Sequence, residues 1–271
     1  MDERLEIDGG TAFRLTILAS GSSGNCALLE LGAEAYLVDA GLSGKKISER
    51  LQALGRSLEE IRAVFLTHEH SDHTMGLPVL ARRKNIPVYS NKLTADSLQK
   101  DLGSYANWQL FETGGTFVLG SLRVVTFPIP HDAYEPVGYT FSDGLRTVGF
   151  LTDLGYATKL VVERVRLADV LVLEANHDLE LLKADTKRPW SVKQRILARH
   201  GHLSNEAAAE VVGQIVTERL KDLFLGHLSE DCNRHELAEA AVLRKFQEMG
   251  VSHVRIHRTY PDRATPTIVL V

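Results

Sequence analysis

The sequence is poor in cysteine and in long apolar runs, and each shortage narrows the possible classes of protein. Its two cysteines, Cys26 and Cys232, lie far apart without ligand spacing, so we expect reduced thiols rather than a disulfide framework. Residues 1–6 lack the basic-then-apolar pattern of a signal peptide, and no stretch approaches the ~20 apolar residues of a membrane span. We therefore expect a cytoplasmic protein with no membrane partner.

Positive charge is also scarce, because the formal net charge is −4. This argues against a broad basic surface of the histone-like kind, but it leaves room for a local basic groove. Residues 183–199 form one basic stretch, with Asp185 as its single acid. That stretch is either a solvated helix face or a nucleic-acid contact. No Pro/Gly/Ser-rich linker divides the chain, so we expect one domain over residues 1–271, with residues 1–12 as a flexible extension.

Short apolar runs alternate with segments of helical periodicity along the whole chain. Predicted strands include residues 13–18, 26–31, 36–38, 63–66 and 170–173, and predicted helices include residues 43–55, 77–84, 93–102, 159–166 and 204–220. Asn233 and Glu236 are spaced as a capping box for a further helix that ends at Met249. The pattern predicts a mixed α/β sandwich, although periodicity does not specify how the strands are divided between sheets.

In the segment Thr-His-Glu-His-Ser-Asp-His at residues 67–73, the six positions from His68 to His73 hold three imidazoles and the carboxylates of Glu69 and Asp72. In an extended segment alternate side chains point the same way, so His68 and His70 can reach one ion. A turn at Ser71 can redirect Asp72 and His73 toward a second ion. This donor set suits zinc best and is compatible with manganese or iron. The segment therefore predicts a site for two divalent metal ions.

The same segment carries the signature His-x-His-x-Asp-His, through which the chain resembles the metallo-β-lactamase superfamily. The resemblance implies an α/β (α+β) fold, a four-layer αββα sandwich, and further ligands: His131 at the first site, His227 at the second and Asp153 between them. Two such cations make a bridging hydroxide available near neutral pH. Asp72 either binds the second ion or acts as a base on that water. No cysteine stands at a ligand position, so lactam hydrolysis is not expected.

Three further motifs resemble the nucleolytic branch of that superfamily. They are Leu-Glu-Ala-Asn-His-Asp at 173–178, Gly-His-Leu-Ser-Asn at 201–205 and Leu-Gly-His at 225–227. In RNase J-like nucleases an acidic residue after a strand orients a histidine that precedes the last metal ligand. Position by position, Glu174 resembles that acid and His202 that histidine. His202 would protonate the leaving oxygen, because a departing alkoxide is a strong base.

The whole chain from residue 13 resembles the bacterial YycJ/WalJ group of metallo-β-lactamase-fold proteins. The segments 18–26 and 227–233 add to the motifs above. Members are regarded as DNA exonucleases that act from the 5′ end and lack the inserted domain of RNase J. The 73 residues between Asp153 and His227 leave no room for that domain either. The resemblance implies a metal-dependent 5′-to-3′ DNA exonuclease, with DNA a more probable partner than RNA.

Alternatives remain open for the substrate and its contacts. The loop at residues 20–25 is either a tight turn or a phosphate contact, and the histidine at 177 either binds a terminal phosphate or packs in a loop. The candidate substrate contacts are Ser22, Ser23, Asn25, His177, Lys187, Arg188 and Lys193. The rival functions are a hydrolase of small phosphodiesters (cyclic nucleotides or cyclic phosphates) or of esters on the same scaffold, and a non-catalytic regulator.

Overall fold

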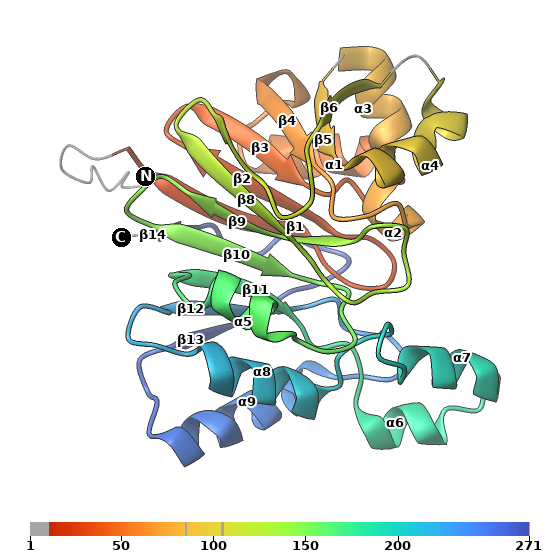
Figure 1. The fold of residues 1–271 in the computed structure, drawn as a ribbon, viewed down its shortest axis with the longest axis vertical. Coiled ribbons are helices and arrows are strands. Elements are labelled where there is room, and N and C mark those ends of the chain that lie inside the picture. Colours follow the sequence, from red (N-terminus) through yellow and green to blue (C-terminus); the bar gives the residue numbers. More distant parts are fainter. Residues whose placement is uncertain (1–10, 85, 104–105, 271) are drawn as a thin grey trace.

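A computed structural model describes residues 11–84, 86–103 and 106–270 and contains two seven-stranded sheets (Figure 1). The first sheet has the order β14-β1-β2-β3-β4-β5-β6, with β1 Phe13–Ala19, β2 Cys26–Leu31, β3 Glu34–Val38, β4 Ile61–Phe65, β5 Pro87–Ser90, β6 Asn107–Leu110 and β14 Ile268–Leu270. The second has the order β13-β12-β11-β10-β9-β8-β7, with β7 Thr116–Leu119, β8 Leu122–Pro128, β9 Val137–Ser142, β10 Thr147–Leu151, β11 Val170–Glu174, β12 Asp222–Gly226 and β13 Arg255–Arg258.

Helices cover the outer faces of the two sheets (Figure 1). The first sheet carries α1 Gly44–Ala53, α3 Leu77–Lys84 and α4 Lys92–Leu102, and the second carries α5 Lys159–Val165, α8 Asn205–Ile215 and α9 His235–Met249. Short helices in the connections are η1 Leu58–Glu60, α2 Ser71–Thr74, α6 Leu179–Ala184 and α7 Trp190–Ile196. The order helix, sheet, sheet, helix confirms the predicted four-layer αββα sandwich.

Alternation along the strands divides the apolar side chains among the layers. On β4, Ala63 and Phe65 face the core between the sheets, whereas Val64 faces the helices of the first sheet. On β11, Val172 faces the central core and Leu171 packs toward α5 and α8. Because β11 is covered on both faces, every one of its side chains is buried, which explains its unbroken apolar run.

Parallel pairing brings several strand ends to one edge of the sandwich. Strands β10, β11 and β12 run parallel in the second sheet, and β3 and β4 run parallel in the first. Glu174 is the last residue of β11, and the loops that follow strand ends at this edge carry Asp39, His68, His131, Asp153 and His227. Residues that are more than 180 positions apart in the sequence can therefore meet at one site.

Two predicted helix limits differ from the structure. The helix expected over residues 204–220 ends at Ile215, and the connection that follows turns Leu220 into the core. The capping box at Asn233 is wrong, because α9 begins at His235 and has no side-chain cap. Asn233 is buried instead, and its amide donates to the carbonyl of Ala175 at 2.7 Å. A second bond joins it to Asn205 at the start of α8, so its amide links separate segments rather than capping α9.

The predicted single domain over residues 1–271 stays a prediction. Of its expected extension over residues 1–12, residues 1–10 lie outside the described part of the chain. In the part that the structure describes, no helix is both long enough and apolar enough to cross a bilayer.

Candidate metal centre

The histidine-rich segment leaves β4 and turns sharply at α2, as its spacing predicts. His70 occupies the position before α2, and the single helical turn then redirects Asp72 and His73. The turn packs tightly on a neighbouring loop, where a Cβ at Gly41 would lie 1.6 Å from the carbonyl oxygen of Asp72. The backbone N–H of Asn25 donates to that same oxygen at 2.7 Å. Only glycine at position 41 allows this approach.

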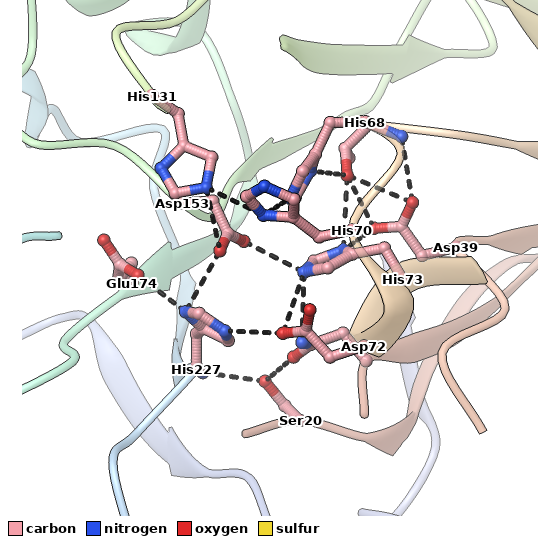
Figure 2. A network of polar contacts seen from close by, with 12 residues as sticks. Ser20, Asp39, His68, His70, Asp72, His73, His131, Asp153, Glu174 and His227 are labelled. Carbon is pink, nitrogen blue, oxygen red and sulfur yellow. Dashed lines mark hydrogen bonds and ion pairs between the residues drawn. The ribbon is translucent and has the colours of Figure 1, made fainter. Parts of the chain in front are cut away.

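Three imidazoles form the first cluster (Figure 2). His68 Nε2 lies 3.0 Å from His70 Nδ1, and His131 Nε2 lies 3.3 Å from the same atom. His131 comes from the loop after β8, so two strands of different sheets supply this cluster. Burial lowers the pKa of His68 well below its ordinary value and also lowers that of His131, so both rings are neutral with a lone pair to offer.

The second cluster combines Asp72, His73, Asp153 and His227 (Figure 2). His227 Nε2 lies 3.3 Å from Asp72 Oδ2, and His73 Nε2 lies 3.2 Å from Asp153 Oδ2. The other oxygen of Asp153, Oδ1, lies 3.8 Å from His131 Nε2 in the first cluster. The same Oδ1 lies 3.4 Å from His227 Nδ1, so Asp153 belongs to the second cluster and also approaches the first, as a bridging carboxylate would.

Four of these imidazoles are oriented by a contact of the ring nitrogen Nδ1 with a neighbouring oxygen. The contacts are His68 Nδ1 with Thr67 Oγ1 at 3.0 Å, His73 Nδ1 with Asp39 Oδ2 at 2.7 Å, His131 Nδ1 with Gly201 O at 3.2 Å and His227 Nδ1 with Glu174 Oε1 at 2.7 Å. Each contact engages Nδ1 and leaves Nε2 turned toward the clusters. Such outer partners orient the rings of metal-binding histidines.

The residues fit a pair of divalent cations. Within each cluster the ligand atoms lie within 4.8 Å of one another. Asp153 Oδ2 is buried without a well-oriented hydrogen bond, so one of its lone pairs is available. Burial opposes protonation of His73, yet Asp153 and Asp39 together raise its pKa well above the ordinary value, which reflects excess negative charge around it. A cation would satisfy both features.

Backbone conformation marks the same residues. Among the described residues other than glycine, positive φ occurs at Asp39, Asp153 and His227, with values of 59°, 59° and 55°. Asp39 and His227 directly follow β3 and β12, and Asp153 comes two residues after β10. This conformation costs about 1–3 kcal/mol per residue. At His227 the neighbouring loops hold it in place, since its N–H donates to Ser20 Oγ at 2.8 Å and its carbonyl accepts from Asn176 Nδ2 at 2.9 Å.

Asp39 is a site residue that sequence reasoning missed. Its carboxylate accepts from the amide and hydroxyl of Thr67 at 2.9–3.1 Å and contacts His73 Nδ1 at 2.7 Å. It therefore orients the histidine segment at both ends. The available signal was its place directly after the predicted strand 36–38, which is also how Glu174 follows its own strand.

Glu174 joins the second cluster to His202. The carboxylate is fully buried, and its Oε1 accepts from His202 Nδ1 at 2.8 Å and from His227 Nδ1 at 2.7 Å. Its Oε2 accepts from the amides of Leu203 and Leu154 at 2.9 and 3.2 Å. Burial opposes ionisation, but the two histidines hold the pKa of Glu174 at about 2. The predicted pair is thus in contact, with Glu174 ionised.

A pocket of about 200 Å³ opens over the two clusters. On one side it is lined by ligands and by His202. The opposite wall is formed by α7 and the turn after it, through Val192, Arg195, Ile196 and His200. Ser22 and Asp132 complete the rim.

Of the three substrate contacts predicted in the loop at residues 20–25, one lines the pocket and two do not. Ser22 lines the pocket, whereas Ser23 is exposed and donates to Glu230 Oε1 at 3.0 Å. Asn25 is buried, receives hydrogen bonds from Ser20 and the Gly21 amide, and has its Nδ2 3.2 Å from His73 Nε2. The loop is therefore a tight turn that also positions ligands, with Ser22 as its member in the pocket.

The remaining substrate-contact candidates do not line the pocket. Both ring nitrogens of His177 are buried without a hydrogen-bond partner in the described chain. Lys187 Nζ pairs with Asp231 at 2.8 Å. Arg188 pairs with the same aspartate at 3.1 Å, and Lys193 is buried with its ammonium donating to a backbone carbonyl at 2.8 Å. In this structure these cations secure the chain around α6 and α7.

Comparison with known proteins identifies the family. Residues 34–221 match the model of the beta-lactamase superfamily domain. The chain therefore belongs to the beta-lactamase superfamily, whose metallo-β-lactamase fold its architecture shares.

Curated relatives match nearly the whole chain. Exodeoxyribonuclease WalJ of Streptococcus pneumoniae is 41% identical over 261 residues, covering 94% of this chain and 97% of that protein. Exodeoxyribonuclease YycJ of Bacillus anthracis is 36% identical over 255 residues, covering 92% and 96%. The predicted resemblance to the YycJ/WalJ group is confirmed.

A solved structure supports the fold independently. The metallo-β-lactamase-fold protein YhfI of Bacillus subtilis superposes with a TM-score of 0.71 at 17% identity, covering 94% of this chain and 99% of that one. At this identity the likeness concerns the fold alone.

Proposed function

We propose that this protein is a metal-dependent phosphodiesterase that degrades DNA as an exonuclease in the 5′-to-3′ direction. The names of two relatives, matched over more than nine-tenths of the chain, support exodeoxyribonuclease activity. The 5′ polarity follows from resemblance to their group and is the part of the proposal that an end-labelling experiment decides.

One observation carries the proposal, which is the carboxylate that His202 and His227 share. Glu174 holds His202 through Nδ1, so its Nε2 is left to carry a proton at the pocket. Despite burial, Glu174 raises the pKa of His202, which favours the protonated ring that a general acid requires. A strongly basic alkoxide leaves when a phosphodiester is cleaved, whereas esters and thioesters have less need of such an acid.

The metal ligands we propose are His68, His70, Asp72, His73, His131, Asp153 and His227. Two divalent cations at these residues would neutralise charge on the phosphoryl oxygens and make water a stronger nucleophile near neutral pH. Zinc is the first choice for imidazole and carboxylate donors, and manganese or iron would accept the same set. Asp72 is part-exposed at the pocket, where it can serve as a ligand or as a base toward water.

The test is degradation of 5′-labelled and 3′-labelled DNA and RNA oligonucleotides by metal-loaded protein. We expect mononucleotide release from the 5′ end of DNA. We expect His202→Ala to slow it about 100-fold or more with unchanged metal content. Part-exposed His253, which lies near the N-terminal end of β12, supplies a matched His→Ala control.

Three results would contradict parts of this proposal. Wild-type turnover in His202→Ala would remove the proposed acid. Release from the 3′ end would reverse the polarity. Cleavage of bis(p-nitrophenyl) phosphate without cleavage of any polymer would indicate a hydrolase of small phosphodiesters.

A further inference from the structure

Helix α7 presents one face to the pocket. Val192, Arg195 and Ile196 have the spacing i, i+3 and i+4, which places them on one side of a helix, and all three line the pocket. Trp190 is 61% exposed and is not part of the lining. Lys193 is buried elsewhere on the helix. The pocket face of α7 is therefore one cation flanked by two apolar side chains.

Arg195 is the one lysine or arginine among the described residues that line this pocket. The acids there are Asp72, Asp132 and Asp153. An anionic substrate must approach past these carboxylates. Bound cations would offset the charge at the clusters, but they would not act on a phosphate one nucleotide away, at the rim. The position of Arg195 suits that neighbouring phosphate.

Arg195 forms an exposed ion pair with Asp132. Its Nε lies 2.5 Å from Asp132 Oδ2, with side chains 64% and 52% exposed. Exposed pairs of this kind contribute little to stability. In the described chain the two terminal nitrogens of Arg195 have no hydrogen-bond or ion-pair partner. The guanidinium can therefore take up a phosphate, with which it forms two parallel hydrogen bonds.

The other cations of the segment have partners elsewhere. Lys183 pairs with Glu180 at 2.9 Å and Arg199 lies over the Tyr156 ring, and neither lines the pocket. Lys187 and Arg188 pair with Asp231, and Arg188 also pairs with Asp185 at 2.7 Å. The ammonium of Lys193 is bound to a backbone carbonyl. These contacts fasten the segment to the loop after β12. They leave Arg195 as the cation of this segment that faces the reacting end of a substrate.

We propose that Arg195 binds the backbone phosphate next to the scissile bond, with Val192 and Ile196 packing against the intervening nucleotide. This inference rests on the proposed nuclease function and names the feature that separates a nucleic-acid strand from a compact phosphodiester, which lacks a second phosphate. On substrate entry the guanidinium exchanges Asp132 for the phosphate. Asp132 thus holds Arg195 at the rim in the free protein.

The experiment removes the two charges separately and together. Wild-type enzyme and Arg195→Gln are each assayed, metal-loaded, on a single-stranded DNA oligonucleotide. The second substrate is the same oligonucleotide with a neutral methylphosphonate at the linkage next to the scissile bond. KM, kcat, metal content and the thermal midpoint are measured for each protein. Arg166→Gln is the matched control, because Arg166 is similarly exposed and pairs only with Glu163 among the described residues.

We expect either single change to raise KM about tenfold, which corresponds to one hydrogen-bonded charge pair. Arg195→Gln assayed on the methylphosphonate substrate should raise KM no further than either change alone, because both changes remove the same contact. The salt dependence of KM should fall by about one ion in Arg195→Gln. Arg166→Gln should behave as wild type on both substrates.

The inference is overturned if Arg195→Gln leaves KM unchanged, or if the two penalties multiply. Should Arg195→Gln unfold or lose metal, Arg195→Lys decides the matter. It keeps the charge, so a methylphosphonate penalty that equals the wild-type value, with an unchanged KM, would show that the two-bond contact does not form. Failure of the proposed function looks different, because wild-type protein would then cleave bis(p-nitrophenyl) phosphate but no DNA.

Discussion

The metal centre and the basic segment at residues 183–199 differ in how their polar side chains find partners. At the metal centre, the ligands lie just after strands whose ends meet at one edge of the sandwich. The order of the strands therefore already brings these side chains together. In the basic segment, two cations pair with an acid more than 40 residues later, and a third is buried against a carbonyl. A ligand pattern at strand ends therefore predicts which side chains meet in the fold, whereas a run of like charges predicts this less well.

The largest test of this comparison is removal of the carboxylate that faces both clusters. We expect Asp153→Ala to lose bound metal and to reduce DNA cleavage by about 1000-fold or more, because its carboxylate approaches histidines of both clusters. Metal content by mass spectrometry and the cleavage rate check this. Asp96→Ala, which removes an exposed aspartate paired with Lys92, should change neither. Full metal occupancy in Asp153→Ala would contradict the bridging role.

A smaller effect is expected where a residue acts through its neighbours. Glu174→Gln keeps the size of the side chain but removes the charge that holds His202 and His227. We expect cleavage at saturating metal to fall about 100-fold while the metal stoichiometry is retained. A titration with metal separates weaker binding from slower chemistry. Unaltered cleavage would mean that the charge of Glu174 is not needed.

Asp39 should matter less, because it touches one ligand from behind. We expect Asp39→Asn to weaken metal affinity about tenfold and to regain most activity when metal is in excess. Competition with a chelator measures the affinity. If affinity does not change, Thr67 alone is enough to orient the segment, and the carboxylate is a structural feature of the strand end.

The smallest effect is expected in the basic segment. Arg188→Gln removes an ion pair with part-exposed Asp231 and one with Asp185, whose side chain is 7% exposed. The surface pair with Asp231 contributes at most about 1 kcal/mol. We expect faster proteolysis near residues 179–200 with metal content and KM unchanged. A rise in KM as large as that of Arg195→Gln would show that the segment contacts substrate more broadly than its ion pairs indicate.

Apolar patterning predicted strands such as β2 and β11 because every side chain of these strands is buried. Residues 26–31 and 77–84 were predicted with the limits that β2 and α3 have. The failures occur where tertiary contacts replace local ones. Asn233 has the spacing of a capping residue, but its amide groups bond to Ala175 and Asn205 between loops. No local pattern distinguishes these two uses of one side chain.

The site shows the same division. The structure brings together the ligands that strand ends and the family signature predicted, and it places His202 against Glu174. Asp39 escaped prediction because one aspartate after a strand is common, and its meaning depends on His73 across a parallel pair. Lys193 was a candidate contact on charge alone, yet it is buried at 6% exposure.

The sequence by itself determined a mixed α/β sandwich and the donors of residues 68–73 with their division between two ions, because alternation and residue chemistry are local properties. The four layers and the remaining ligands were implied by the family resemblance. The tertiary structure alone decided which charges face the pocket. Arg188 and Arg195 are the same residue type and lie in one basic segment. Arg195 lines the pocket, whereas Arg188 forms an ion pair with Asp231. That difference depends on long-range contacts, which hold Arg188 at Asp231 and Arg195 at Asp132.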